Sequence, residues 1–279
     1  MAEGYARPEA VVATAWVAQH LNDPAVRLVE VDEDTSLYAQ GHLPGAVTLD
    51  WWKDLEDQLQ RDVITGEAFA EKVAGKGIGD DTTVVFYGDK NNWFATYAYW
   101  LFRYNHHDNV KIMNGGRQKW IGEGRALTTD TPSVTPARHG THGTRPEIRA
   151  LRDQVLAGVG RVALVDVRSP REYAGEIVAP EGYPQEGAQR GGHVPGAANI
   201  PWGQAVAEDG TFKTVAELKA LYGGKGVTPD REVIAYCRIG ERSSHTWFVL
   251  HELLGYGHVR NYDGSWTEYG SIVGAPIER

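Results

Sequence analysis

The chain contains one cysteine, Cys237, and its neighbours give this thiol a setting suited to chemistry. It directly follows an apolar run at 233–236, and the segment Arg-Ile-Gly-Glu-Arg at 238–242 leads to a helix expected at 243–254. A strand, a short loop and a helix N-terminus turn backbone N–H groups toward the loop, which favours binding of anions. We therefore expect Cys237 to be a catalytic nucleophile rather than a small buried hydrophobic residue.

The loop supplies further groups for this chemistry. The guanidinium groups of Arg238 and Arg242 could bind oxyanions through their planar sets of donors. Gly240 permits a tight turn, and Ser243 and Ser244 are candidate N-cap residues. A helix terminus contributes roughly 0.3–2 kcal/mol, and about 1.4 kcal/mol shifts a pKa by one unit. With help from loop N–H groups and the arginines, we expect a largely ionised thiolate at neutral pH.

The elements that position this loop belong to an internal repeat of domain size. Gly-His-Leu-Pro-Gly-Ala at 41–46 recurs as Gly-His-Val-Pro-Gly-Ala at 192–197, and apolar runs match in the same order in both halves. Between the halves, the stretch 128–146 carries six Thr and three Pro, which suits an extended linker. We expect an N-terminal domain at 1–140 and a C-terminal catalytic domain at 141–279.

Each half alternates short β-branched runs with helical patterns. The expected fold class is α/β, with a mainly parallel sheet flanked by helices on both faces in each domain. In the first half, Gly88 stands where the repeat requires the cysteine and is followed by Asp89 and Lys90, so we expect that half to be catalytically inactive. The second half has gained about 16 residues at 176–191, which form either a neutral surface loop or a wall beside the strand ends.

Composition limits the partners and the location. The 279 residues are 42% hydrophobic and 23% charged, which predicts compact folded domains. The formal net charge of −9 argues against nucleic acid and anionic membranes as partners. With no long apolar run and no pattern of a signal peptide, we expect a cytoplasmic protein. A single cysteine excludes an internal disulfide, and we expect no metal and no cofactor.

Together these motifs resemble the two-domain rhodanese family of thiosulfate and mercaptopyruvate sulfurtransferases. The resemblance covers nearly the whole chain and rests on the tandem halves, the paired Gly-His blocks, the loop Cys-Arg-Ile-Gly-Glu-Arg at 237–242 and the closing Tyr-Asp-Gly-Ser-Trp at 262–266. It implies two rhodanese-like domains, of which the second carries a persulfide intermediate on Cys237. The loop is most similar to that of actinobacterial-type thiosulfate sulfurtransferases.

The sequence departs from vertebrate-type thiosulfate enzymes at two positions. Ile239 stands where those enzymes have a lysine, and Glu172 stands where they have an arginine. The loop favours thiosulfate as the donor, and the resemblance implies thiosulfate:cyanide sulfurtransferase activity. The acceptor is cyanide or another thiophilic molecule such as a thiol, and a protein acceptor is also open. The alternatives are a 3-mercaptopyruvate sulfurtransferase and a non-catalytic persulfide carrier or interaction module.

In the expected mechanism the thiolate attacks the outer sulfur of thiosulfate and sulfite leaves. Arg242, and secondarily Arg238, would bind the sulfonate, with Arg238 the better suited of the two to pair with a carboxylate instead. The backbone of Ile239, Gly240, Glu241 and Ser243 would surround the transferred sulfur.

Four charged or polar residues have expected supporting roles. Asp166 and Arg168 stand at the end of an expected strand, where they would form an ion-pair scaffold under the loop. Arg190 and His193 lie in or beside the inserted segment and would line the entrance to the site.

Overall fold

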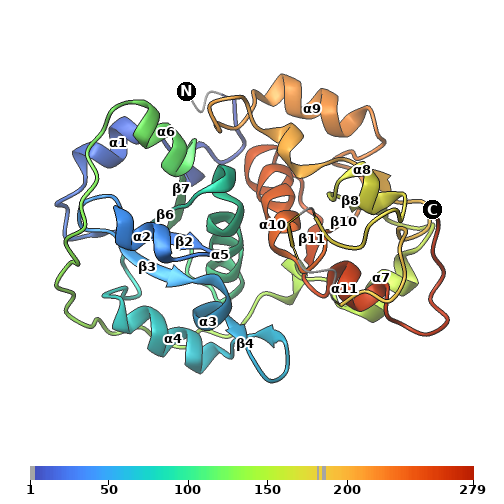
Figure 1. The fold of residues 1–279 in the computed structure, drawn as a ribbon, viewed down its shortest axis with the longest axis horizontal. Coiled ribbons are helices and arrows are strands. Elements are labelled where there is room, and N and C mark those ends of the chain that lie inside the picture. Colours follow the sequence, from blue (N-terminus) through green and yellow to red (C-terminus); the bar gives the residue numbers. More distant parts are fainter. Residues whose placement is uncertain (1–3, 181, 184–186) are drawn as a thin grey trace. The chain divides into compact units, whose positions relative to one another are not determined.

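The structure is a computed structural model that describes residues 4–180, 182–183 and 187–279. Its contacts divide the chain into two compact units, drawn in Figure 1. Unit 1 contains Pro8–Arg145 and Val206–Phe212. Unit 2 contains Gly4–Arg7, Pro146–Ala205 and Lys213–Arg279. Each unit therefore takes a short segment from the other half of the sequence, and the ranges 1–140 and 141–279 stay a prediction.

Unit 1 is built on a five-stranded parallel sheet with the strand order β1-β7-β6-β2-β3. A small antiparallel pair, β4 with β5, lies outside that sheet. The strands are β1 (Val11–Val12), β2 (Val26–Asp32), β3 (Val47–Asp50), β4 (Glu56–Asp57), β5 (Asp62–Val63), β6 (Thr83–Tyr87) and β7 (Val110–Met113).

Helices cover both faces of this sheet, as expected. Helix α5 packs against β2, β6 and β7 on one face, because nearly all of its residues are apolar. On the other face, Val17 of α1 and Trp120 of α6 pack with Leu28 and Val85. The helices are α1 (Thr14–Gln19), α2 (Ser36–Gln40), α3 (Trp51–Leu55), α4 (Gly66–Gly75), α5 (Trp93–Tyr104) and α6 (Gly116–Gly122), with short 3₁₀ turns η1 (Pro8–Ala10) and η2 (Lys90–Asn92).

Unit 2 repeats this plan with a four-stranded parallel sheet in the order β11-β10-β8-β9. Its strands are β8 (Ala163–Asp166), β9 (Ala198–Asn199), β10 (Val233–Tyr236) and β11 (Val259–Tyr262). Its helices are α7 (Arg152–Gly158), α8 (Pro170–Tyr173), α9 (Val215–Gly223), α10 (Glu241–Phe248) and α11 (Ser265–Tyr269), with 3₁₀ turns η3 (Pro146–Ile148) and η4 (Trp202–Ala205) and a π-helical turn η5 (Val249–Leu253). Helix α10 packs on β10 and β11, so it covers one face of the sheet.

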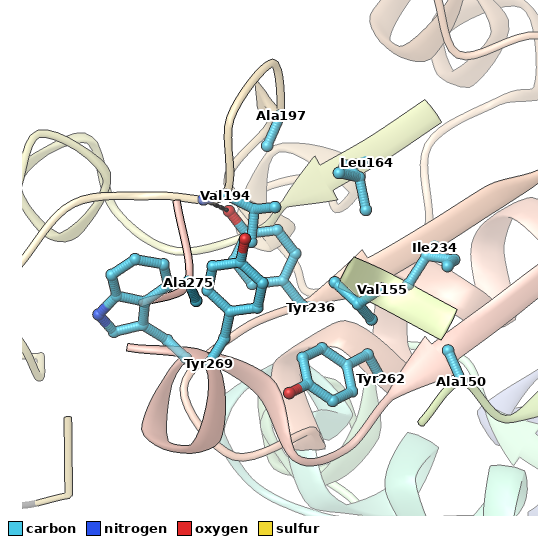
Figure 2. Packing of buried hydrophobic residues seen from close by; sticks show 11 residues of the cluster. Ala150, Val155, Leu164, Val194, Ala197, Ile234, Tyr236, Tyr262, Tyr269 and Ala275 are labelled. Atoms are coloured by element: carbon cyan, nitrogen blue, oxygen red, sulfur yellow. Dashed lines mark hydrogen bonds between the residues drawn. The ribbon is translucent and has the colours of Figure 1, made fainter. Parts of the chain in front are cut away.

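A cluster of buried aromatic and aliphatic side chains covers the opposite face of the unit 2 sheet (Figure 2). Tyr236 and Tyr262, from the neighbouring strands β10 and β11, point into this cluster beside Tyr269 of α11. The Tyr236 hydroxyl accepts a hydrogen bond from the backbone N–H of Val194 at 3.1 Å. This bond ties the second Gly-His block to the strand that precedes the cysteine.

The helix after Cys237 and the inserted segment can be compared with their expected structures. The helix expected at 243–254 begins two residues earlier, at Glu241, and passes into a π-helical turn at Val249–Leu253. The described part of the inserted segment 176–191 contains no strand and no helix, while residues 181 and 184–186 lie outside the described residues. Across the described residues, no helix has both the length and the apolar character that crossing a membrane requires.

Candidate active site

Cys237 lies at the carboxyl end of β10 and is fully buried. Its backbone N–H donates to Ser265 Oγ at 3.0 Å. The sulfur accepts a hydrogen bond from the Gly240 N–H at 3.1 Å, and the thiol lies 3.4 Å from Glu241 Oε2, to which it donates. The loop thus holds the sulfur between a backbone donor and a carboxylate acceptor.

The electrostatic setting of the sulfur differs from the expectation. Burial raises the pKa of the Cys237 thiol, and the Glu241 carboxylate raises it further. Arg242 and the backbone N–H groups of Ser243 and Gly240 lower the pKa, but they do not outweigh these two effects. The expectation of a largely ionised thiolate is therefore wrong for this conformation, because water is excluded and a negative charge stands beside the sulfur.

The turn at Gly240 shapes the loop around the sulfur. Its φ is +103°, and a Cβ at this position would lie 2.6 Å from the Cα of Asp263, so only glycine fits. The Gly240 carbonyl accepts a hydrogen bond from the Asn261 side-chain amide at 3.1 Å, and Ser243 Oγ lies 2.6 Å from Asn261 Oδ1. Ser243 and Ser244 do not cap the helix, because α10 already begins at Glu241.

Arg242, and not Arg238, is the loop arginine that pairs with a carboxylate. Arg242 forms a two-pronged ion pair with Glu172, with both N···O distances 2.9 Å, and the two side chains are only 4% and 0% exposed. We expected Arg238 to be the arginine that pairs with a carboxylate. Burial alone would raise the pKa of Glu172, but the hydrogen bonds and charge of Arg242 hold that pKa below its ordinary value.

Arg238 meets the inserted segment. Its guanidinium lies over the ring of Tyr183, 5.3 Å from the ring centroid, and its Nε has no hydrogen-bond partner among the described residues. Tyr183 belongs to the segment 176–191, so part of that segment lies against the loop that follows Cys237. Ile239, between the two arginines' positions, is half-buried.

The expected scaffold of Asp166 and Arg168 is present. Arg168 Nη2 lies 2.5 Å from Asp166 Oδ2, and both side chains are fully buried. The same Nη2 donates to the Gly192 carbonyl at 2.7 Å. In the sheet, Asp166 is in register with Tyr236, the residue before the cysteine. The ion pair therefore connects the strand ends under the loop with the second Gly-His block.

Arg190 and His193 make contacts of a structural kind. His193 stacks on Tyr173 with ring centroids 3.5 Å apart, and its backbone N–H donates to Glu278. Arg190 donates to backbone carbonyls near the end of the described chain, those of Tyr269, Gly270, Ile272 and Ala275. Their expected role at an entrance stays a prediction.

Sequence reasoning missed several residues that hold the loop. Asn261 supports Gly240 from β11, and Ser265 supports Cys237 from the start of α11. Ser265 has a left-handed φ of +50°, and the matching Gly116 in unit 1 has a φ of +56°. The matching turns Asn-Gly-Gly at 114–116 and Asp-Gly-Ser at 263–265 contained this signal, but sequence alone gave no reason to connect it with the sulfur. Glu172 was noted only as a departure from a motif, not as the partner of Arg242.

Comparison with known proteins places these features in a family. A model of the rhodanese-like domain matches the chain twice, over residues 13–123 and 151–271. A relative from Thermus thermophilus named "Sulfur carrier protein TtuD" is 57% identical over 281 residues, which cover 99% of both chains. A relative from Saccharopolyspora erythraea named "Putative thiosulfate sulfurtransferase" is 54% identical and covers 98% of this chain and 97% of its own.

Solved structures show the same fold at greater distance. The crystal structure of YnjE matches 99% of this chain and 70% of its own with a TM-score of 0.84 at 24% identity. Wild-type EanB matches 98% of this chain and 69% of its own with a TM-score of 0.85, also at 24% identity. At this level of identity the likeness concerns the fold alone.

Proposed function

Because the chain belongs to the rhodanese family of sulfurtransferases, we propose that it transfers the outer sulfur of thiosulfate to a thiophilic acceptor through a persulfide on Cys237. The observation that carries the proposal is the position of the only cysteine in the chain. It stands between a strand end and a helix N-terminus, with the Gly240 N–H 3.1 Å from its sulfur. No second thiol is available to form or resolve an intermediate.

The first half-reaction forms the persulfide. The Cys237 sulfur attacks the outer sulfur of thiosulfate, a new S–S bond forms, the S–S bond of thiosulfate breaks, and sulfite leaves with the electron pair. The thiol proton passes to Glu241, whose carboxylate already accepts its hydrogen bond at 3.4 Å. Glu241 therefore raises the thiol pKa in the resting protein and also provides the acceptor for its proton.

Binding of the sulfonate is assigned to Arg238. The charge of Arg242 is already compensated by Glu172 in a buried ion pair, whereas the guanidinium of Arg238 lies over the ring of Tyr183. A guanidinium that is not committed to a buried carboxylate has more to gain from an incoming oxyanion. Arg242 then acts as a positioning residue that fixes the start of α10.

The second half-reaction returns the enzyme to its thiol form. A nucleophilic acceptor attacks the outer sulfur of the persulfide, and Cys237 leaves as the thiolate, which takes its proton back from Glu241. With cyanide the product is thiocyanate, and with a thiol it is a new persulfide. The Gly240 N–H stabilises negative charge on the sulfur in both half-reactions.

A second candidate function is supported by the relative named as a sulfur carrier protein, which is 57% identical to this chain. A carrier also holds a persulfide on its cysteine, but it delivers the sulfur to one protein partner rather than to small acceptors. The two functions differ in turnover: an enzyme consumes many equivalents of thiosulfate and cyanide, whereas a carrier loads a single sulfur and then waits for its partner.

One experiment tests the proposal and separates the candidates. Mass spectrometry after thiosulfate treatment should show one added sulfur on the wild type and none on Cys237→Ser, and that substitution should reduce thiocyanate formation by on the order of 10³-fold or more. Thr131→Ala, at an exposed position of the linker, is the matched control and should load and turn over like the wild type. Residual turnover of Cys237→Ser within tenfold of wild type would exclude the covalent mechanism, and loading without multiple turnover would favour a carrier.

A further inference from the structure

A group of imidazole and carboxylate side chains gathers in unit 1, where the linker runs past the loop between α4 and β6. Asp80 comes from that loop, and His139 and His142 come from the linker 128–146. One ligand atom from each lies within 4.8 Å of the other two. Asp80 Oδ1 is 2.7 Å from His142 Nε2 and 3.8 Å from His139 Nδ1. None of these residues lies in the loop around Cys237.

A third histidine, His107, contacts His139 on the side away from Asp80, so that the rings of His139 and His107 form a row that leads into the interior. His139 Nε2 lies 3.1 Å from His107 Nδ1, and His107 Nε2 lies 2.9 Å from the Thr82 carbonyl oxygen. At the other end of the row, His139 Nδ1 lies 2.8 Å from the Gly140 carbonyl oxygen. The two rings therefore stand between two backbone carbonyls, and both of these end groups can only accept hydrogen bonds.

The two rings have too few protons to donate in all three of these contacts. Three hydrogen bonds would need three protons on the four ring nitrogens, but two neutral imidazoles bring only two. When His107 donates to Thr82 and His139 donates to His107, the lone pair of His139 Nδ1 faces the Gly140 carbonyl oxygen across 2.8 Å. A positive ion beside Nδ1 would satisfy both atoms.

We propose that Asp80, His139 and His142 bind a divalent transition-metal ion of the zinc class. Two imidazole nitrogens and a carboxylate oxygen are a donor set that suits Zn²⁺ and Ni²⁺ and disfavours Mg²⁺ and Ca²⁺. The hydrogen bond from His139 Nε2 to His107 is the outer contact that orients metal-binding histidines. The Gly140 carbonyl oxygen is placed to serve as a further ligand.

The distances require only small adjustments. Ligands about 2.0–2.2 Å from a tetrahedral zinc ion lie roughly 3.4 Å from one another. The pair at 2.7 Å must open and the pair at 3.8 Å must close, and the Asp80 and His142 side chains, 44% and 43% exposed, are free to turn. The His139 side chain, which is 1% exposed, is held in place and sets the position of the site.

The backbone of the linker is shaped to bring these side chains together. The Gly140 N–H donates to Asp80 Oδ1 at 2.9 Å, and a Cβ on Gly140 would lie 2.9 Å from the His142 ring. The glycine therefore allows His142 to fold back over Asp80. A metal ion in this place would fasten the linker to the body of unit 1, and it would stabilise the folded state in proportion to its concentration.

The test is zinc binding by the tag-free full chain carrying Cys237→Ser, which removes the thiol as a competing zinc ligand. After treatment with a chelator, titration calorimetry with ZnCl₂ should show one ion per chain, and zinc should raise Tm. His142→Gln and Asp80→Asn should each weaken binding by at least about tenfold and abolish the rise in Tm. His258→Gln, which removes an exposed histidine of unit 2, is the matched control and should bind zinc like its parent.

Three results would overturn the proposal: no zinc bound by the parent, binding unchanged in His142→Gln and Asp80→Asn, or equal loss in the His258→Gln control. MgCl₂ should give no binding heat, and stoichiometric magnesium binding would also contradict the donor chemistry. Because Asp80 and His142 are partly exposed, their variants should fold, so circular dichroism of the metal-free proteins verifies that lost binding is not lost structure.

Discussion

The loops after β6 and after β10 occupy matching places in the two units, but only one of them carries a thiol. In unit 2 the loop contains a single left-handed residue, Gly240, with φ +103°. In unit 1 three consecutive residues are left-handed, Lys90, Asn91 and Asn92, with φ values of 44°, 58° and 64°. The backbone of the unit 1 loop therefore follows a different path from that of the loop after β10.

Under each of the two loops, a buried arginine pairs with an acid at a strand end and donates to a glycine carbonyl, but the arginine comes from a different position in each unit. In unit 2, Arg168 pairs with Asp166 and donates to the Gly192 carbonyl. In unit 1 the matching acid Glu30 and the matching Gly41 carbonyl are held by Arg117, which comes from α6 rather than from the strand end. The same buried contacts are thus made by an arginine from a different position.

The contacts that both units share support the fold, whereas the groups suited to sulfur chemistry lie in unit 2. Buried polar groups need partners wherever the strand ends meet the Gly-His block, so both units keep an acid and an arginine there. The thiol, the Gly240 turn and the Arg242–Glu172 pair exist only in unit 2. We propose that unit 1 retains the fold without the catalytic step, which matches the expectation that it is inactive.

The largest effect is expected from breaking the ion pair found only in unit 2. Arg242→Ala leaves Glu172 buried without its cation, which should lower the free energy of unfolding by about 3–5 kcal/mol. Arg171→Ala, at the neighbouring and more exposed position, should change it by less than about 1 kcal/mol. Urea denaturation measures both, and the double variant Glu172→Gln/Arg242→Met should recover part of the loss because no unpaired charge is left buried.

Steady-state kinetics of the Arg238→Ala and Arg242→Ala variants with two sulfur donors test which arginine binds the sulfonate. Arg238→Ala should fold normally and lose a charge-assisted contact of roughly 1.5–3 kcal/mol, about 10- to 150-fold in kcat/KM for thiosulfate. Its loss for 3-mercaptopyruvate, whose anionic group is a carboxylate, should be smaller. If instead Arg242→Ala is stable and loses activity selectively for thiosulfate, Arg242 rather than Arg238 binds the sulfonate.

The sequence predicted the parts of this site that lie close together along the chain. The thiol after a strand, the glycine turn and the Asp166–Arg168 pair are all local patterns, and the repeat predicted two units with parallel sheets. The pairing of Glu172 with Arg242 spans 70 residues, so only the fold brings the two together. The thiol pKa was mispredicted for the same reason, because burial depends on tertiary packing.

The next largest effect is expected from placing a cysteine at Gly88, the position in unit 1 that matches Cys237. A Cβ at position 88 would lie 2.5 Å from the Val31 carbonyl oxygen and 2.8 Å from Asp32 Oδ1, so Gly88→Cys forces the backbone to shift. We expect a loss of stability of about 1–3 kcal/mol and no second persulfide after thiosulfate treatment. Gly75→Cys, where a Cβ meets nothing within 4 Å, controls for an added thiol. Two sulfurs per chain in Gly88→Cys would show that the unit 1 loop is competent.

A smaller effect, on the reactivity of the thiol, is expected from replacing Glu241, which matches Asn92 of unit 1. Asn92 Oδ1 accepts from the Gly88 N–H in unit 1, whereas the matching Glu241 accepts from the thiol in unit 2. Because the Glu241 charge raises the thiol pKa, Glu241→Gln should move the pH midpoint of iodoacetamide alkylation to lower pH and speed alkylation at neutral pH severalfold. Turnover should nevertheless fall, since the proton acceptor is lost. An unchanged midpoint would mean that burial alone raises the pKa.

The smallest expected effect lies in unit 1, where Asp32 occupies the position of Arg168. Burial, and next the hydrogen bond with Asp89, raise the pKa of Asp32 to about 9. The unfolded carboxyl titrates near 3.9, so between these values the native state holds a proton that the unfolded state has lost. Stability from this group is therefore fully present below about pH 4 and declines as the pH rises toward 9.

Asp32→Asn removes this titration and keeps the local bonds. In the wild type the Asp89 N–H donates to Asp32 Oδ1 at 2.8 Å. In the variant the amide oxygen can accept this bond, and the NH₂ group can donate to the Asp89 carboxylate. For units of this size 1 kcal/mol moves Tm by about 2–4 °C, so the variant should melt a few degrees higher than wild type at pH 8 and equally at pH 4. The exposed Asp34→Asn is the control and should not flatten the pH dependence. A lower Tm for Asp32→Asn at pH 8 would mean that unit 1 holds Asp32 as a carboxylate, and hence that its strand end keeps a charge as unit 2 does.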